Sequence, residues 1–199
     1  MSATKSSLVA LLFCLFMTGC TSGQTLEEIE ATFPMSLDVQ SLEAVNQDGQ
    51  SFTTDNLDGE VWLASFIFTN CDTVCSPMTA TMSKLQQKLK DEGVHASLVS
   101  FSIDPENDTP EVLKDFGETM DADFSSWDFL TGYDQETIEI FANTSFLTPA
   151  AKIEGSNQFI HSTSIYLISQ SGKVLQQYDG VAETPFDQII TDVKKLSGN

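Results

Sequence analysis

The chain contains no arginine and few other basic residues, so acidic side chains dominate its charge. Lysine and arginine together number 9, against 29 aspartate and glutamate residues, which gives a formal net charge of −20 at pH 7. Proteins that bind nucleic acid neutralise its phosphates with clustered lysine or arginine. We therefore predict no nucleic-acid partner, and we expect a soluble surface that attracts cations or basic patches on partner proteins.

Long hydrophobic runs are missing as well, because no apolar stretch approaches the roughly 20 residues that a membrane-spanning helix needs. The apolar block Leu8–Met17 follows the only early charge, Lys5, and leads into Met17-Thr18-Gly19-Cys20. This order is typical of a secretory signal, and its last residues resemble a bacterial lipobox, in which the cysteine is acylated. The pattern predicts lipidation of Cys20 and a lipid-anchored protein at the extracytoplasmic face of a bacterial cell membrane.

The N-terminal pattern also sets the expected domain organisation. We predict a lipoprotein signal peptide at residues 1–19, an acidic tether at 20–34 and one folded domain at 35–199. Removal of the signal leaves 199 − 19 = 180 residues, a length that suits one domain with a full core.

Cysteine is scarce, and only two cysteines fall in the predicted domain. Cys14 lies in the predicted signal and Cys20 at its end, which leaves Cys71 and Cys75. Such a pair can be oxidised outside the cytoplasm. A disulfide between residues four apart closes a very small loop, however, and constrains little of the unfolded chain. The pair therefore indicates chemistry rather than a structural crosslink.

The apolar pattern alternates between strands and helices, which favours a three-layer α/β domain. Residues 61–68 are continuously apolar and predict a buried central strand, and apolar residues then recur at helical spacing from Met78 to Leu89, before Gly93. This order resembles the thioredoxin fold, with a central mixed sheet and an added N-terminal β-hairpin. The other expected elements are a hairpin of 39–45 and 51–54, a strand at 96–103, a helix from Thr109-Pro110 to about 120, a strand at 127–131, a helix at 135–145, a long loop at 147–160, a hairpin of 163–168 and 173–178, and a last helix capped by Thr184-Pro185 that ends near 196.

The two thiols follow the central strand at the start of a helix. Residues four apart share one face of a helix, so two thiolates at this spacing can hold one soft metal ion or close into a disulfide. We expect the helix N-terminus to lower the thiol pKa. The spacing by itself permits both metal binding and redox exchange.

Histidine is even scarcer than cysteine, because the chain contains only His95 and His161. His95 opens a strand at the end away from the thiols, where a surface or packing role is expected. His161 lies on the loop that enters a late central strand, which in a thioredoxin-like layout runs beside the strand that leads to the thiols. Two thiolates and an imidazole form a soft three-ligand set that suits copper. A loop histidine without a ligand role is the competing interpretation.

Four segments of the sequence resemble the SCO/SenC family of membrane-tethered, extracytoplasmic copper proteins that assemble cytochrome c oxidase. They are 66–71, 75–79, 99–106 and 161–164. The resemblance extends over roughly residues 35–196. It implies copper, Cu(I) or Cu(II), as the cofactor, with Cys71, Cys75 and His161 as its ligands. It also implies cytochrome c oxidase subunit II as the partner, whose dinuclear copper centre would receive the metal or have its cysteines kept reduced.

Two carboxylates near the predicted ligands are candidate supporting residues. Asp72 and Ser76 occupy positions where many family members carry proline. Asp72, beside Cys71, should raise that thiol's pKa and favour a bound cation. Asp104 ends the neighbouring strand, where it either supports the site or caps the turn before Pro105.

A copper chaperone is the expected function, and an enzyme is the alternative. A dedicated thiol–disulfide oxidoreductase would use Cys71 and Cys75 as a redox-active disulfide. The spacing exceeds that of a redox CxxC motif, and residues 159–168 lack the proline that thioredoxin-type enzymes place opposite their thiols. A thiol peroxidase would need threonine at position 68, where this chain has Phe68, and an arginine. A redox sensor remains open.

Overall fold

The apolar stretch that predicts the central strand forms β4 (Trp62–Ile67), in which all six residues are buried. The structure is a computed structural model and describes residues 24–71 and 74–198. The predicted signal peptide, Cys20 and Asp72 lie outside these residues. Burial on both faces explains why β4 is apolar apart from Ser65, because a strand between two helical layers has no solvent side. The hydroxyl of Ser65 is paired with that of Ser100 on β5.

The main sheet has eight strands, in the order β1-β10-β9-β4-β5-β6-β2-β3. β4, β5 and β6 run parallel, whereas β9 runs antiparallel to β4, so the sheet is mixed as predicted. Its other strands are β1 (Leu37–Asp38), β2 (Glu43–Asn46), β3 (Ser51–Thr53), β5 (Ser97–Ser102), β6 (Trp127–Thr131), β9 (Ser164–Ile168) and β10 (Lys173–Asp179).

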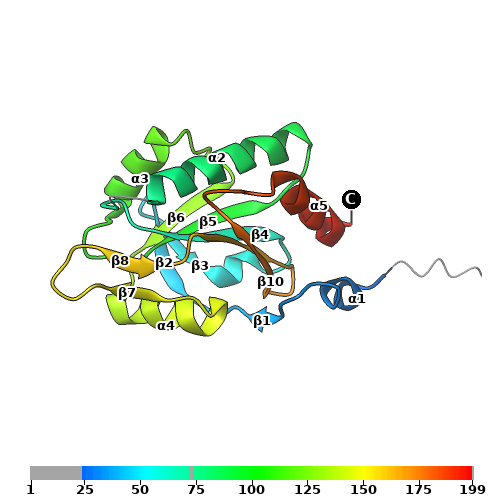
Figure 1. Ribbon diagram of the computed structural model, residues 1–199, viewed down its shortest axis with the longest axis horizontal. Helices are drawn as coiled ribbons and strands as arrows, with labels where there is room; N and C mark the ends of the chain where they lie inside the picture. The colour runs from blue at the N-terminus through cyan, green and yellow to red at the C-terminus, as the bar shows by residue number, and fades with distance from the viewer. Residues whose placement is uncertain (1–23, 72–73, 199) are drawn as a thin grey trace, which may run out of the picture.

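Helices cover both faces of this sheet and complete the three layers (Figure 1). α2, α3 and α5 pack on one face, around a core that includes Met82, Leu113 and Ile189. α4 packs on the other face, where Phe141 and Phe146 meet Phe66 and Phe101 of the central strands. The helices are α1 (Leu26–Glu30), α2 (Cys75–Asp91), α3 (Pro110–Thr119), α4 (Gln135–Phe146), α5 (Phe186–Ser197) and the short 3-10 helix η1 (Thr54–Leu57).

The two predicted hairpins are present, although the first strand of the N-terminal one covers residues 43–46 rather than the expected 39–45. β2 and β3 pair antiparallel around the turn that contains Gly49 and extend the sheet beyond β6. β9 and β10 pair across the turn that ends at Gly172. Both glycines have positive φ values, +74° and +73°, which explains why glycine stands at these turns.

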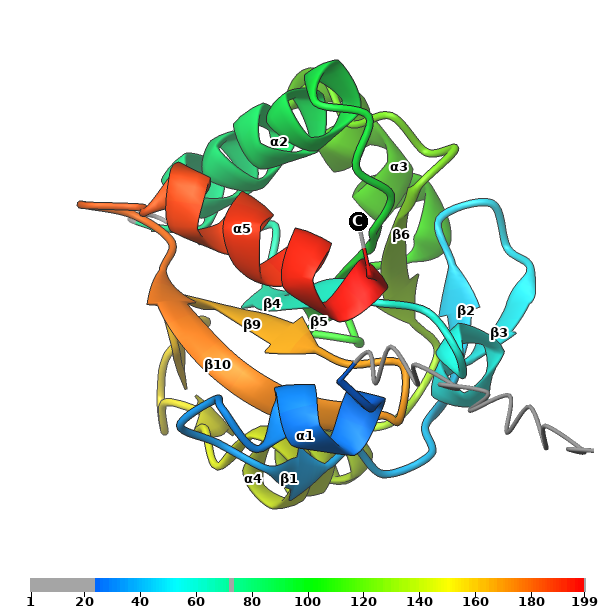
Figure 2. The same ribbon diagram turned by 90° about the vertical axis from the view of Figure 1, so that its right-hand side faces the viewer.

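Three elements differ from the sequence-based expectations. The segment expected as a long loop, 147–160, contains β7 (Ala150–Lys152), which pairs with β8 (Phe159–His161) in a separate two-stranded sheet. Within the residues expected as a tether, α1 folds as a helix, and it packs beside α5 (Figure 2). α5 is capped at Pro185 without a side-chain hydrogen bond, rather than by Thr184.

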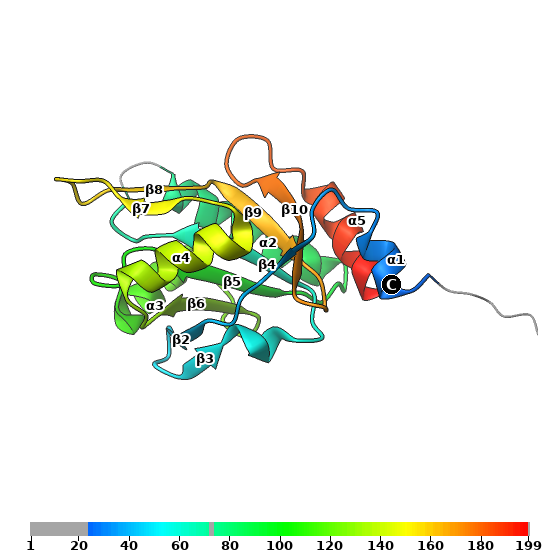
Figure 3. The ribbon, with the colours of Figure 1, turned by 90° about the horizontal axis from the view of Figure 1, so that it is seen from below.

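The β7–β8 hairpin projects from one end of the molecule, and α1 lies at the opposite end (Figure 3). β7 and β8 have only three residues each. An alternation of apolar and polar residues over so few positions cannot be recognised as a strand pattern in the sequence. In the described part of the chain, no helix combines the length and the apolar character needed to cross a bilayer.

Candidate metal centre

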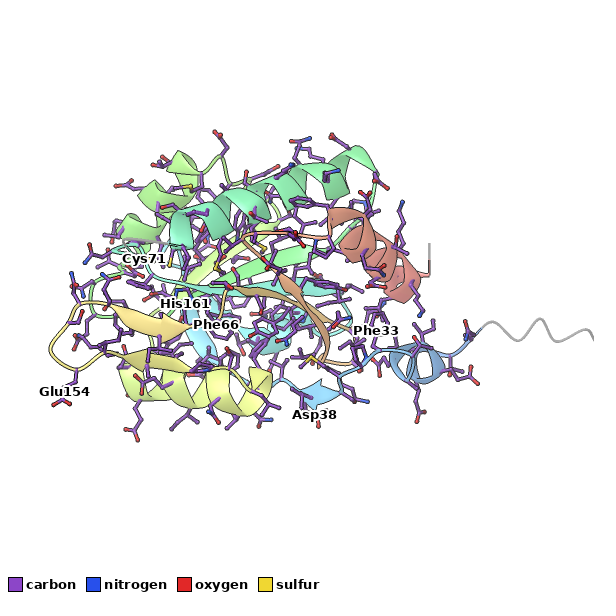
Figure 4. The ribbon with its side chains drawn as sticks, viewed as in Figure 1. Phe33, Asp38, Phe66, Cys71, Glu154 and His161 are labelled. Carbon is purple, nitrogen blue, oxygen red and sulfur yellow. The ribbon has the colours of Figure 1, made fainter. Side chains whose placement is uncertain are left out.

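The ends of three segments meet at the pole of the molecule that carries the β7–β8 hairpin. Cys71 lies in the loop after β4, Cys75 is the first residue of α2, and His161 is the last residue of β8. Their ligand atoms all lie within 4.8 Å of one another. Figure 4 shows Cys71 and His161 at this same end of the sheet. Chain topology therefore brings together residues up to 90 positions apart in the sequence, from 71 to 161.

Cys71 does not occupy a helical turn, contrary to the sequence-based expectation. α2 begins only at Cys75, so helix geometry does not fix the spacing of the two sulfurs. The loop between β4 and α2 does so instead. Both residues are in the thiol form, with Cys75 buried and Cys71 partly exposed.

Burial raises the pKa of the Cys75 thiol, with a hydrogen bond to Cys71 and the charges of Cys71 and Asp108 acting in the same direction. A backbone hydrogen bond at Phe68 lowers this pKa but does not reverse the shift. The expectation that the helix N-terminus lowers the thiol pKa is thus wrong for Cys75. Desolvation outweighs the helix dipole because Cys75 is only 1% exposed and belongs to the core.

The imidazole of His161 is oriented with one nitrogen towards the sulfurs. Its Nδ1 lies 2.8 Å from the carbonyl oxygen of Ser162, and its Nε2 lies 3.4 Å from Sγ of Cys75. A carbonyl only accepts hydrogen bonds, so Nδ1 carries the proton and Nε2 presents its lone pair to the thiol. Burial lowers the pKa of His161, and hydrogen bonds to the backbone of Ser162 and Phe66 raise it. The environment therefore favours the neutral form that a metal ligand requires.

Aromatic side chains hold this ring in place. The ring of Phe68 meets the His161 ring edge to face, with centroids 5.6 Å apart, and also packs on Phe159 of the same hairpin. Gln158 adds a polar link, because its Nε2 donates to the carbonyl oxygen of Asn70 at 3.0 Å. The hairpin that carries His161 is thus attached directly to the loop that carries Cys71.

The candidate supporting residue Asp104 is engaged elsewhere. Both of its carboxylate oxygens accept from Nδ2 of Asn107 at 2.9 Å, and its backbone carbonyl accepts from the amides of Asn107 and Asp108. The cluster of ligand atoms among the described residues does not include it. Asp104 therefore acts in the turn after β5, which is the alternative that the sequence left open.

Asp108, a fully buried carboxylate near the thiols, was not predicted as part of the site. It accepts hydrogen bonds from the backbone and side chain of Thr69, two residues before Cys71, and its charge contributes to the raised pKa of Cys75. Its position between Asn107 and Thr109-Pro110 marked it as a residue of a helix start, and no local pattern signals a contact with a loop 39 residues earlier.

Comparisons with known proteins agree with this picture. The sequence profile of the SCO1/SenC family matches residues 35–198. The SCO1 protein homolog of Bacillus subtilis is 47% identical over 197 residues, which cover 99% of this chain and 98% of that protein. A putative copper-binding protein of Stutzerimonas stutzeri is 30% identical over 144 residues, covering 71% of this chain and 69% of that protein.

Two solved structures are similar in fold and sequence. A SCO1/SenC family lipoprotein from Bacillus anthracis superposes with a TM-score of 0.79 and 47% identity, covering 81% of this chain and 95% of that chain. BsSco, a member of the Sco family of cytochrome c oxidase assembly proteins in which a disulfide switch was identified, gives a TM-score of 0.77 and 51% identity, covering 82% and 95%. The predicted thioredoxin-like α/β fold and the predicted family resemblance are both confirmed.

Proposed function

Because this chain belongs to the SCO1/SenC family, we propose that it is a copper chaperone that supports the assembly of cytochrome c oxidase. In this proposal copper is a cargo held by Cys71, Cys75 and His161. Its destination is the dinuclear copper centre of oxidase subunit II. The observation that carries the proposal is the convergence of two sulfurs and one imidazole nitrogen within 4.8 Å.

The chemistry of this donor set suits copper. Thiolates are soft ligands that select Cu(I), and imidazole binds both Cu(I) and Cu(II). The lone pair of Nε2 already faces Cys75, and the bond from Nδ1 to Ser162 fixes the orientation of the ring. The site thus needs little rearrangement before it can bind a metal ion.

The different exposure of the three ligands suits the transfer of copper to a partner protein. Cys71 and His161 are partly exposed, whereas Cys75 is buried. Thiolates of a partner protein can therefore replace the two accessible ligands one at a time, while Cys75 retains the metal until the last step. A fully buried site would need to open before any exchange.

Replacement of each ligand tests the proposal. We expect the full chain to bind one Cu(I) in competition with a chromogenic chelator. Cys71→Ser, Cys75→Ser and His161→Ala should each lower the affinity by more than the roughly 10–100-fold typical of changes in residues that support a ligand. His95→Ala is the matched control, because His95 is exposed and outside the cluster.

Electron paramagnetic resonance of the Cu(II)-loaded chain gives a second measurement. Coupling to one imidazole nitrogen should disappear in His161→Ala and persist in His95→Ala. Unchanged Cu(I) affinity and an unchanged spectrum in His161→Ala would contradict the proposed ligand set.

A dedicated thiol–disulfide reductase is the alternative hypothesis, and the structure offers it less support. The attacking species in thiol exchange is the thiolate, and the raised pKa of Cys75 keeps that thiol protonated. The raised thiol pKa hinders metal binding less, because the metal ion itself displaces the proton from the sulfur.

A further inference from the structure

Asp108 lies between β5 and α3, and its carboxylate is fully buried. Oδ1 accepts from the amide of Thr69 at 3.2 Å and from its hydroxyl at 2.5 Å. Oδ2 accepts from the same amide at 3.3 Å and from the hydroxyl of Ser102 at 2.5 Å. One side chain therefore links the end of β5 to the loop that follows β4.

The hydrogen-bond pattern favours the ionised carboxylate. The amide of Thr69 can only donate, and Ser102 Oγ accepts from the amide of Asp104 at 3.1 Å, which leaves its hydroxyl proton for Asp108. Burial raises the pKa of Asp108 above its ordinary value, and the bonds from Ser102 and Thr69 offset only part of this shift, so the support for the ionised form is the set of donors around the carboxylate. Among the ion pairs of the described residues, none includes Asp108. Its negative charge is thus balanced by hydrogen bonds rather than by a cation.

The loop that Asp108 holds carries a proposed copper ligand. Cys71 belongs to neither a helix nor a strand, so its position depends on how this loop is attached to its surroundings. Asp108 fixes Thr69 from one side, and Gln158 fixes Asn70 from the other. Gln158 is partly exposed and forms a neutral hydrogen bond, whereas the bonds to Asp108 are buried and charge-assisted, and such bonds are stronger.

We infer that Asp108 is a positioning residue for Cys71, and that its buried negative charge makes the site favour Cu(II) relative to Cu(I). The inference rests on the proposed copper site. Replacement of two thiol protons by Cu(I) leaves the site one unit of charge more negative than replacement by Cu(II). A fixed negative charge nearby opposes the more negative state.

Asp108 lies near the ligands, because its carboxylate is bonded to the amide and the hydroxyl of Thr69, two residues before Cys71. The aspartate acts without touching the metal ligands in the described contacts, so its effect combines loop attachment and charge. These two contributions predict different outcomes when they are removed separately.

The test compares three variants of the full chain. Asp108→Asn removes the charge and part of the attachment. Thr69→Val removes one bond to the carboxylate and keeps the charge. Asp128→Asn is the matched control, because Asp128 is a partly buried carboxylate on β6 that bonds to Asn46 at 3.0 Å.

The first measurement uses the metal-free chain and does not depend on copper. Hydrogen exchange of the Thr69 and Asn70 amides should accelerate in Asp108→Asn and in Thr69→Val, and stay unchanged in Asp128→Asn. The second measures competition with chelators for Cu(I) and for Cu(II) separately. Asp108→Asn should lower Cu(I) affinity roughly 10–100-fold and Cu(II) affinity by a larger factor. Thr69→Val should lower both by the same, smaller factor.

The outcomes separate the inference from the proposed function. Equal losses for the two ions in Asp108→Asn would overturn the charge effect, and unchanged amide exchange would overturn the positioning role. If Asp108→Asn does not fold, Thr69→Val still decides the positioning role through exchange and Cu(I) affinity. Absence of copper binding by the unsubstituted chain would instead refute the proposed function. The amide-exchange measurement would still decide whether Asp108 holds the loop that carries Cys71, because it uses the metal-free chain.

Discussion

At the scale of single residues, the candidate centre joins three side chains in different environments. Cys75 is buried in the core, and Cys71 and His161 stand at its edge. The buried sulfur has a raised pKa, and the imidazole has a lowered pKa, both chiefly through desolvation. Cys75 and His161 are therefore kept neutral until a metal ion replaces the proton of the Cys75 thiol.

This arrangement predicts a pH dependence of copper affinity. The pKa of Cys75 in the folded chain lies above its ordinary value, so the proton remains bound throughout the neutral range and must leave when copper binds. Proton release becomes easier as the pH rises, and the affinity for Cu(I) should increase about tenfold per pH unit for each proton released. Competition titrations from about pH 6 to above the ordinary thiol range near 8.5 measure this slope. A plateau that begins below that range would contradict the raised pKa.

The same residues show what the sequence could and could not predict. Cys71, Cys75 and His161 were predictable because cysteine and histidine are so rare in this chain. Their environment was not, because burial of Cys75 depends on how α2 packs against the sheet. Asp108 was missed for a related reason, since an aspartate before Thr109-Pro110 has a sufficient local explanation as part of a helix start.

At the scale of elements, β9 and β10 connect the site to the core. His161 ends β8, and β9 begins three residues later at Ser164. Gly180, just beyond β10, donates its amide to the carbonyl of Thr163 at 2.9 Å. A Cβ atom at Gly180 would lie 2.5 Å from that carbonyl oxygen, so the backbone that follows His161 leaves no space for a side chain.

Gly180→Ala should therefore weaken both the fold and the site. The contact forces the segment of Thr163 to move, at a cost of about 1–3 kcal/mol in the free energy of unfolding. Displacement of His161 should lower Cu(I) affinity as well. Denaturant unfolding and Cu(I) competition measure the two effects.

Gly172→Ala is the matched control for this change. Gly172 lies in the turn of the same hairpin, with φ of +73° and open space around its Cβ position. Alanine there costs about 1–2 kcal/mol through the backbone alone and should leave Cu(I) affinity unchanged. Equal copper affinities for the two variants would show that Gly180 does not support the site.

Long elements were easier to predict than short ones. The expected bounds of β6 match those observed, and those of α4 differ by one residue at the end, since both have clear apolar periodicity. β7 and β8 were missed because their three residues each offer no period to detect, and the pairing of Ala150 with His161 is a tertiary feature. The β7–β8 hairpin, which positions the imidazole of His161, was therefore not predicted from the sequence.

At the scale of the whole molecule, the chain is strongly acidic, and we further propose that it is attached to a membrane through a lipid at Cys20. The support is the lipobox-like Met17-Thr18-Gly19-Cys20 and the similarity to a Bacillus anthracis lipoprotein. Attachment by lipid requires no spanning helix.

Cys20→Ser should shift the protein from the membrane fraction to the soluble fraction. Cys14→Ser is the control, because Cys14 lies within the predicted signal and its loss should not alter fractionation. Centrifugation of cell lysates after a high-salt wash, followed by mass spectrometry of the N-terminal peptide, measures both outcomes. A Cys20→Ser protein that still sediments with membranes would refute acylation as the means of attachment.

The packing of α1 against α5 determines which end of the domain lies near the proposed lipid attachment at Cys20. Only three residues separate Cys20 from Gln24, where the described chain begins, so the two are at most about 14 Å apart. Phe33, just after α1, and Cys71 lie at opposite ends of the molecule (Figure 4). Acyl chains at Cys20 would therefore attach the domain to the membrane near its α1 end, with the sulfurs at the opposite end of the domain. In our proposal, a recipient domain would approach the copper from the side opposite the lipid attachment.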